Sequence, residues 1–293
     1  MKRRPTAMPG HGPLTGGAPA KQGPQPAARV PATADLGAPN SPIIVLSYAY
    51  AGAERVQNAL AAGSRLACTS GTGIIPQCAA AAETWRRVEG RQGMTMSPLA
   101  AAATRGLVTA QITAILATSG QPRWCELATA GPAAAETFLQ VFPHAHFVCV
   151  HRSCLDVIRA GVHANPWGLQ GQGFTPFLLA YPGNSVAALA AYWATSAEHL
   201  LAFEQANQQA TDRVRYEDVT TQPDKALAAV RAALGLGDAE SDDIPSAQPG
   251  WLAEPADAPA EHDATVPVGM IPDPLRQRIT RLHAELRYPP PER

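Results

Sequence analysis

The chain is 293 residues long, with 46% hydrophobic residues, 16% charged residues, 28 prolines and 24 glycines. Lysine and arginine total 23 and aspartate and glutamate 24, giving a formal net charge of −1. That balance argues against a generally basic nucleic-acid-binding protein, although a local basic patch stays open. The length suits one large α/β domain or two small ones with a well-buried core.

The ends and the cysteines of the chain indicate a cytosolic protein. Lys2, Arg3 and Arg4 make the N-terminus basic, but no apolar segment of about 7–15 residues follows, which argues against a secretory signal. We find no run of about 18 apolar residues free of charges and turn-formers, so no membrane span is predicted. Five cysteines without paired C-x-x-C spacing argue against a disulfide framework and a zinc site.

The chain divides by composition into a tail and one domain. Residues 1–41 are rich in Pro, Gly and Ala and hold almost no large apolar side chains, which predicts a disordered tail. Residues 42–293 are predicted to form a single domain. Within it, residues 238–274 are acidic at first and Pro/Ala-rich, and we expect them to be rich in loops.

Strands and helices alternate from Pro42 onward. Short apolar runs predict strands at 43–46, 65–69, 123–127, 147–150 and 214–216. Helical patterns lie at about 54–62, 77–88, 97–117, 132–141, 156–162, 186–205, 223–234 and 274–286. An irregular, aromatic segment spans 165–184. This alternation predicts an α/β fold: a three-layer sandwich with a central parallel sheet and helices on both faces.

The first strand leads into a loop suited to phosphate. Residues 43–46 are followed by the small-residue turn 47–53 and then by a helix, the geometry that seats phosphates at helix N-termini. Gly52 would let backbone amides approach an anion, or would simply form a tight turn. The turn Ser70-Gly71-Thr72-Gly73 is a second small loop after a strand, and binds an acceptor or an anion or is a plain turn.

Three segments in this order resemble the sulfotransferase family that uses 3′-phosphoadenosine 5′-phosphosulfate (PAPS). They are 42–47 (PIIVLS) with the loop and helix after it, 142–158 (FPHAHFVCVHRSCLDVI), and 214–219 (VRYEDV) with Pro223 and 232–236 (AALGL). The likeness spans roughly residues 42–237, and the last helix is similar to the family's usual ending. The resemblance implies a P-loop-like version of the three-layer fold.

The same resemblance implies a donor site, with PAPS as co-substrate and no metal. The loop after the first strand would hold the phosphosulfate, Arg152 the 3′-phosphate, and Tyr216 would approach the adenine. The loop residues concerned are Ser47, Tyr50, Ala51, Gly52, Ala53 and Glu54. From the residues alone, Arg152 follows a buried strand and is suited to grip a phosphate, or it pairs with Asp156.

The chain departs from the family pattern at several positions. Tyr50 stands where the family has a cation, and Ala53 and Glu54 stand where it has hydroxyl side chains. Ala160 replaces an expected serine, and 127–129 (LAT) replaces a lysine-containing stretch. A carboxylate in the first turn of the helix would also repel a phosphosulfate. These departures weaken the chemical prediction more than the prediction of the fold.

Two residues are candidates for catalysis. Arg55, just inside the first helix, would supply the cation that Tyr50 does not, or is an exposed helix arginine. Glu126 ends a short strand near the expected acceptor side, and burial could raise its pKa enough for a general base. The rival bases are the histidines 151, 163 and 199. By strand alternation, the first of these points away from Arg152 and is expected to be structural.

The sequence predicts transfer of the PAPS sulfuryl group to a hydroxyl of a small molecule or natural product. The acceptor is expected to be apolar or aromatic, because Trp167, Phe174, Phe177, Tyr181 and Trp193 would wall a pocket or else pack in the core. No nucleic-acid or membrane partner is expected. Two alternatives stay open: a protein of this fold that binds a metabolite or protein without transfer, and a repurposed fold with another reaction.

Overall fold

The computed structural model describes residues 41–90, 95–129, 131–165, 168–169, 173–236 and 266–290. All of them belong to one unit of chain contacts, Ala32–Arg293. Residues 1–40 of the predicted tail, Trp167 of the predicted aromatic wall, and residues 238–265 of the predicted loop lie outside the described residues.

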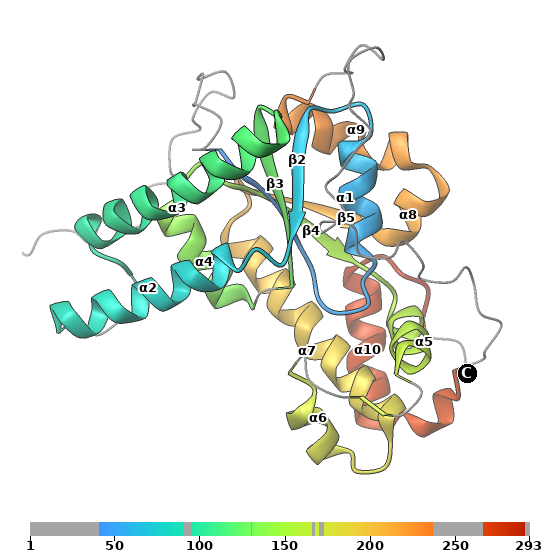
Figure 1. Cartoon of the computed structure of the whole chain (residues 1–293). Coiled ribbons are helices and arrows are strands. Elements are labelled where there is room, and N and C mark those ends of the chain that lie inside the picture. Colours follow the sequence, from blue (N-terminus) through green and yellow to red (C-terminus); the bar gives the residue numbers. More distant parts are fainter. Residues whose placement is uncertain are drawn as a thin grey trace, which may run out of the picture. The chain divides into compact units, whose positions relative to one another are not determined.

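A parallel sheet forms the centre of this unit (Figure 1), and its strands follow the order β2-β3-β1-β4-β5. Every neighbouring pair is parallel, with β1 between β3 and β4. The strands are β1 Ile43–Leu46, β2 Leu66–Ser70, β3 Arg123–Ala128, β4 His146–His151 and β5 Thr211–Arg215. Because all strands point the same way, their carboxyl ends share one edge of the sheet, where ligands bind in open α/β folds.

Helices connect the strands and cover the sheet. They are α1 Ala53–Ala61, α2 Ile74–Glu89, α3 Pro98–Ser119, α4 Pro132–Val141, α5 Cys154–Ala164, α6 Thr175–Ala180, α7 Ser185–Ala206, α8 Tyr216–Thr221, α9 Pro223–Leu234, the 3₁₀ turn η2 Val268–Met270, and α10 Asp273–Glu285. The predicted cap of α3 is confirmed, since the Ser97 hydroxyl accepts the amide of Ala100 at 3.1 Å and Pro98 opens the helix.

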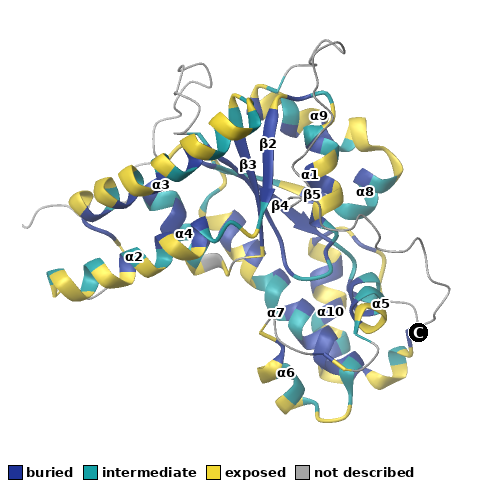
Figure 2. Ribbon diagram, viewed as in Figure 1, coloured by how far each residue is buried: buried dark blue, intermediate teal, exposed yellow. Residues whose placement is uncertain are grey.

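Two apolar clusters lie on the two faces of the sheet. Alternate side chains of β1 divide between them: Ile43 and Val45 pack with α1, α8 and α9, whereas Ile44 and Leu46 pack with α2, α3, α4 and α7. The strands are accordingly buried along nearly their whole length, apart from the edge strand β5 (Figure 2). This arrangement confirms the predicted α/β fold, a central parallel sheet with helices on both faces.

The last strand differs from the prediction of 214–216. β5 ends at Arg215, and Tyr216 is the first residue of α8. The short helix is favoured because Glu217 and Asp218 lie in its first turn, where carboxylates suit the helix dipole, and Val219 is buried. The sequence of β5, TDRVR, has one apolar residue, because an edge strand needs fewer buried side chains.

The segment predicted to be irregular contains a short helix. α6 begins with Thr175-Pro176, and proline suits the first turn of a helix because its missing amide would have no partner there. The amide of Leu178 donates to Phe174 O at 3.0 Å, and that of Tyr181 donates to Phe177 O at 3.0 Å.

Helix α3 is long and apolar enough to span a membrane by length and composition alone, and 22% of the relevant window is buried. In this fold α3 packs on β3, α2 and α4 through one narrow stripe, Ala100, Thr104, Val108 and Ile112. Its side chains Leu99 and Leu107 are exposed. The sequence reading did not anticipate this helix as a candidate span, because Arg105 and Gly106 interrupt it.

Candidate functional site

The predicted donor-site residues meet at the carboxyl ends of β1, β4 and β5. The loop 47–52 joins β1 to α1, Arg152 follows β4, and Tyr216 follows β5. Since β1 and β4 are direct neighbours and β5 flanks β4, the three segments lie side by side at one edge of the sheet. The structure thus brings together residues far apart in the sequence.

The side chain of Arg152 lies between the loop and Tyr216. Its Nη1 donates to the carbonyl oxygen of Tyr50 at 3.1 Å, and its guanidinium carbon lies 4.2 Å from the centre of the Tyr216 ring. Such a cation–π contact is worth about 0.5–2 kcal/mol. Within the described residues, its Nε is buried and has no hydrogen-bond partner. This donor is therefore available to an anion.

The backbone of Arg152 is fixed by aromatic side chains. Its amide donates to the Tyr48 hydroxyl at 3.0 Å, and its carbonyl accepts from Trp193 Nε1 at 2.9 Å. Burial raises the pKa of Tyr48 well above its usual value, so this phenol stays neutral. The sequence alternative of an Arg152–Asp156 pair is not what the structure shows, because that aspartate pairs with Arg159.

Gly52 is a loop residue whose backbone lies close to the Tyr216 ring. It has φ +73° and precedes α1, and a Cβ built on it would lie 2.3 Å from Cε2 of Tyr216. Only glycine fits both the backbone angle and the contact with the ring. In the described part of the chain, no side chain caps the first amides of α1. The amide of Arg55 donates to Gly52 O at 3.1 Å, and the amides before it at the start of α1 form the cradle proposed for an anion.

Tyr50 also has a left-handed backbone, with φ +65°. Its hydroxyl accepts from Asn165 Nδ2 at 2.7 Å, and its ring stacks on Phe174 with centroids 5.9 Å apart. The position at which the family carries a cation is thus occupied by an aromatic side chain held against α5 and the segment before α6.

The remaining predicted loop residues have ordinary environments. Ser47 is buried and its amide donates to Ala128 O at 3.0 Å, while Ala51 and Ala53 are buried among apolar side chains. Glu54 and Arg55 are exposed on the first turn of α1. No hydrogen bond or ion pair holds the Arg55 side chain within the ranges that the structure describes. Its guanidinium is therefore free to meet an anion.

Glu126 is buried, and both of its carboxylate oxygens accept hydrogen bonds. Its Oε1 accepts from the amide and hydroxyl of Thr72 at 3.0 and 2.8 Å, and its Oε2 accepts from the hydroxyl of Thr69. Burial raises the pKa of Glu126, and the three hydrogen bonds oppose that rise. These contacts hold the turn between β2 and α2, the second small loop of the sequence.

The rival histidines lie elsewhere. His151 is completely buried, and its Nε2 lies 2.8 Å from Glu204 Oε1. Burial alone would raise the pKa of Glu204, but His151 and Arg213 hold it below its usual value. His163 and His199 are exposed on α5 and α7.

The aromatic residues predicted to wall an acceptor pocket form packed contacts. The ring centroids of Phe174 and Tyr192 lie 4.5 Å apart, and those of Phe177 and Tyr192 lie 5.6 Å apart. Tyr192 and Asn165 were missed by sequence reasoning; a tyrosine facing the donor loop from a helix leaves no local signal. Tyr48 was also missed, although it lies in the same loop as Tyr50.

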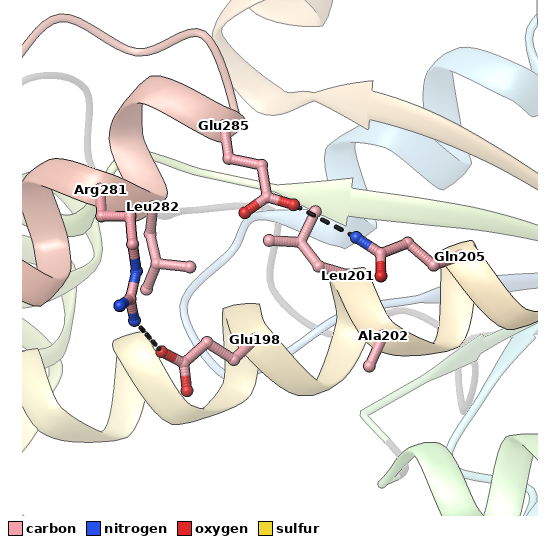
Figure 3. Close-up of a pocket in the computed structure, with 7 residues that line it drawn as sticks. All are labelled: Glu198, Leu201, Ala202, Gln205, Arg281, Leu282 and Glu285. Carbon is pink, nitrogen blue, oxygen red and sulfur yellow. Dashed lines mark hydrogen bonds and ion pairs between the residues drawn. The ribbon is translucent and has the colours of Figure 1, made fainter.

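Two hollows lie away from the cradle. One, of about 210 Å³, lies between α7 and α10, where Glu198 pairs with Arg281 and Gln205 donates to Glu285 (Figure 3). The second, of about 670 Å³, runs beside β5 and α10. Neither has Arg152 or Gly52 in its described lining, so neither belongs to the predicted donor site.

A sequence profile described as the sulfotransferase family matches residues 42–240. The chain belongs to the sulfotransferase family. The match covers the loop after β1, Arg152 and Tyr216, so all three site segments of this sulfotransferase lie inside it. A search of curated proteins returned no match.

One solved sulfotransferase structure shares the fold, and others are similar to a lower degree. The sulfotransferase domain of the curacin biosynthetic pathway is 16% identical, with a TM-score of 0.52, and covers 86% of this chain and 99% of its own. The sulfotransferase domain of the Synechococcus PCC 7002 olefin synthase is 17% identical, with a TM-score of 0.48, covering 88% of this chain and 98% of its own. An Alicyclobacillus acidocaldarius sulfotransferase is 13% identical with a TM-score of 0.44, covering 85% and 96%.

The arrangement of the described His, Cys, Asp and Glu side chains bears on metal binding. Among the residues that the structure describes, no three His, Cys, Asp or Glu side chains gather in a way that could hold a metal ion. The five cysteines are free and buried. For an anionic donor, by contrast, the unpartnered Nε of Arg152 and the cradle beside Gly52 are a fit, while Tyr50 supplies no cation.

Proposed function

We propose that this sulfotransferase uses PAPS as its donor and transfers the sulfuryl group to a hydroxyl of a small molecule. The observation that carries the proposal is Arg152: a guanidinium at the strand ends, beside the glycine cradle, with a buried Nε that no described group satisfies. A buried unpaired donor costs about 1–3 kcal/mol, and an anion removes that cost. Family membership supports the same donor.

The proposed reaction breaks the S–O bond to the donor's 5′-phosphate and forms an S–O bond to the acceptor oxygen. The acceptor proton is released, and the other product is adenosine 3′,5′-bisphosphate. We assign the 3′-phosphate to Arg152 and the phosphosulfate to the cradle of Gly52 and the first amides of α1. Arg55 is the proposed cation for the charge that develops on transfer, because its side chain is exposed and unpaired.

The proposed acceptor is apolar or aromatic. Phe174 stacks on Tyr50, Tyr192 packs on Phe174, and Phe177 packs on Tyr192. A natural product fits this proposal, since the similar curacin domain belongs to a biosynthetic pathway. A cytosolic location and independence of metal ions and nucleic acids complete it.

One observation favours a second candidate, a member of the family that binds nucleotide without transfer. Tyr50 replaces the loop cation, and its own carbonyl oxygen accepts from Arg152. Both oxygens of Glu126 already accept hydrogen bonds from threonines, which makes its carboxylate a weaker base for the acceptor. Both features favour binding over turnover.

Calorimetry with adenosine 3′,5′-bisphosphate tests the donor. We expect binding to the wild type and a loss of about tenfold or more in Arg152→Gln, because a charged hydrogen bond to phosphate is removed. Arg281→Gln, on the exposed face of α10, is the matched control and should bind like the wild type. No heat of binding at millimolar nucleotide would end the PAPS proposal.

Transfer of radiolabelled sulfate from PAPS to a panel of phenols and alcohols separates the two candidates. Turnover supports the first. If the nucleotide binds but no acceptor is sulfated, a second assay with Tyr50→Arg follows. Activity appearing only in that variant would identify the missing loop cation as the cause and would favour the non-transferring candidate.

A further inference from the structure

Among the described residues, Tyr50 alone contacts both Arg152, through its backbone, and the aromatic segment, through its side chain. Its carbonyl oxygen accepts from Arg152 Nη1 at 3.1 Å. Its hydroxyl accepts from Asn165 at 2.7 Å, and its ring stacks on Phe174 at 5.9 Å. The proposed donor and acceptor sides of the site are thus joined through a single residue.

We propose that Tyr50 is a positioning residue that couples nucleotide binding at Arg152 to the segment 173–181. The inference rests on the proposed function, since it assumes that the ligand of Arg152 is the nucleotide donor. It gives a role to the residue that stands in place of the family cation. Nucleotide binding at Arg152 favours a conformation of Tyr50 in which its ring is withdrawn from Phe174. Tight packing of α6 favours the stacked conformation.

The physical basis is the shared backbone of Tyr50. A phosphate bound at the unpartnered Nε draws the guanidinium of Arg152 toward itself and so strains the Nη1 hydrogen bond that holds the Tyr50 carbonyl. The residue has φ +65°, a conformation that costs a non-glycine residue about 1–2 kcal/mol and persists only while its surroundings hold it. Releasing the carbonyl therefore favours a change of backbone that withdraws the ring from Phe174.

Packing at Gly161 makes the response of the ring abrupt. A Cβ at Gly161 would lie 3.2 Å from Cδ2 of Tyr50, so the ring already rests closely on α5. A ring confined in this way cannot follow a backbone change gradually, since packed interiors resist small shifts. The Tyr50 ring therefore has two discrete positions, one stacked on Phe174 and one withdrawn from it.

Hydrogen exchange tests the coupling without any nucleotide. In ligand-free protein, Arg152→Gln removes the hydrogen bond to the Tyr50 carbonyl. The amides of Leu178 and Tyr181 in and after α6 should then exchange about two- to tenfold faster, the range that one stacking contact sets. Arg215→Gln, whose parent side chain contacts Asp218 and Arg287 instead, is the control and should leave both amides unchanged. Unchanged exchange in Arg152→Gln overturns the coupling, whether or not the nucleotide binds.

Calorimetry with adenosine 3′,5′-bisphosphate tests it in the other direction, because coupling is reciprocal. Phe174→Leu keeps an apolar side chain but loses the stack on Tyr50, so we expect the nucleotide to bind about two- to tenfold more tightly. Phe177→Leu, whose parent ring packs on Tyr192, should bind like the wild type. Tyr50→Phe keeps the stack and should stay within about twofold of the wild type.

Each outcome of the calorimetry supports or overturns the coupling. Tighter binding in Phe174→Leu but not in Phe177→Leu supports the coupling, because a purely structural role for Phe174 predicts weaker binding or none. Equal affinity in all three variants overturns it. Absence of binding in every protein ends the proposed function, and the exchange experiment then still decides whether Tyr50 links Arg152 to α6.

Discussion

At the scale of single residues, Gly52 is the position where the backbone of the site tolerates least change. We expect Gly52→Ala to lower the free energy of unfolding by roughly 2–4 kcal/mol, measured by urea titration. The left-handed backbone accounts for about 1–2 kcal/mol of that cost. The remainder comes from displacing the Tyr216 ring, two of whose carbons would lie 2.3 and 2.6 Å from the new methyl group.

Gly71→Ala is the matched control for this prediction. Gly71 has φ +65°, and nothing lies within 4 Å of a Cβ built there, so the control carries the backbone cost alone. Equal losses in the two variants would contradict the contact with Tyr216. Replacing Tyr216 by valine should reduce the cost of Gly52→Ala to that of the control.

At the scale of elements, Glu126 joins β3 to the turn between β2 and α2. Glu126→Gln replaces one carboxylate oxygen by an N–H₂ group that faces donors, so we expect a loss of about 1–3 kcal/mol in unfolding free energy. If the residue only holds the turn, sulfuryl transfer by the folded variant should stay within about tenfold of the wild type. A general base would lose roughly 10²–10⁴-fold.

Thr72→Val loosens the same turn while keeping the carboxylate, so it separates the two roles of Glu126. Similar activity in both variants supports a structural role. A folded Glu126→Gln protein without activity, beside an active Thr72→Val protein, would restore Glu126 as the catalytic base.

Apolar patterns in the sequence predict the helices and strands that bury many side chains. They do not predict the elements that bury few. β1 and β4 are buried on both faces, so continuous apolar runs marked them. α4 and α9 were bounded by Pro at the start of each helix, and α9 also by Gly235 at its end. The edge strand β5 and the short helices α6 and α8 bury few side chains, so the strand was predicted at shifted bounds and the two helices were not predicted.

For the molecule as a whole, the topology brings the residues of the proposed donor site together, but their mutual contacts could not be predicted from the sequence. A parallel sheet brings the ends of β1 and β4 together, which the alternation of elements implies. That Tyr216 rests on Gly52, and that Tyr50 packs with Phe174, depends on tertiary distances that no local pattern encodes. The departures from the family motif drew attention to the loop after β1 without showing what its side chains contact.

The stability of the whole unit should decline with acid through His283, which links α10 to α5. Its Nε2 accepts the amide of Cys154 at 3.2 Å and its Nδ1 donates to Pro289 O at 2.7 Å, so the ring is neutral. Burial lowers its pKa below 6.5. As pH falls, the unfolded chain therefore binds a proton first, and stability present above pH 6.5 is lost below it.

Urea unfolding at a series of pH values between about 7.5 and 5 measures this loss, with a slope of at most about 1.4 kcal/mol per pH unit from one group. Glu204 adds nothing in that window, because its pKa lies below 4.5 and its contribution is lost only in stronger acid. His283→Gln should be less stable at neutral pH and should lack the slope. His199→Asn, at an exposed position of α7, should keep it. A His283→Gln protein that keeps the wild-type pH dependence from pH 7.5 to 5 would show that the neutral ring does not hold α10 on α5.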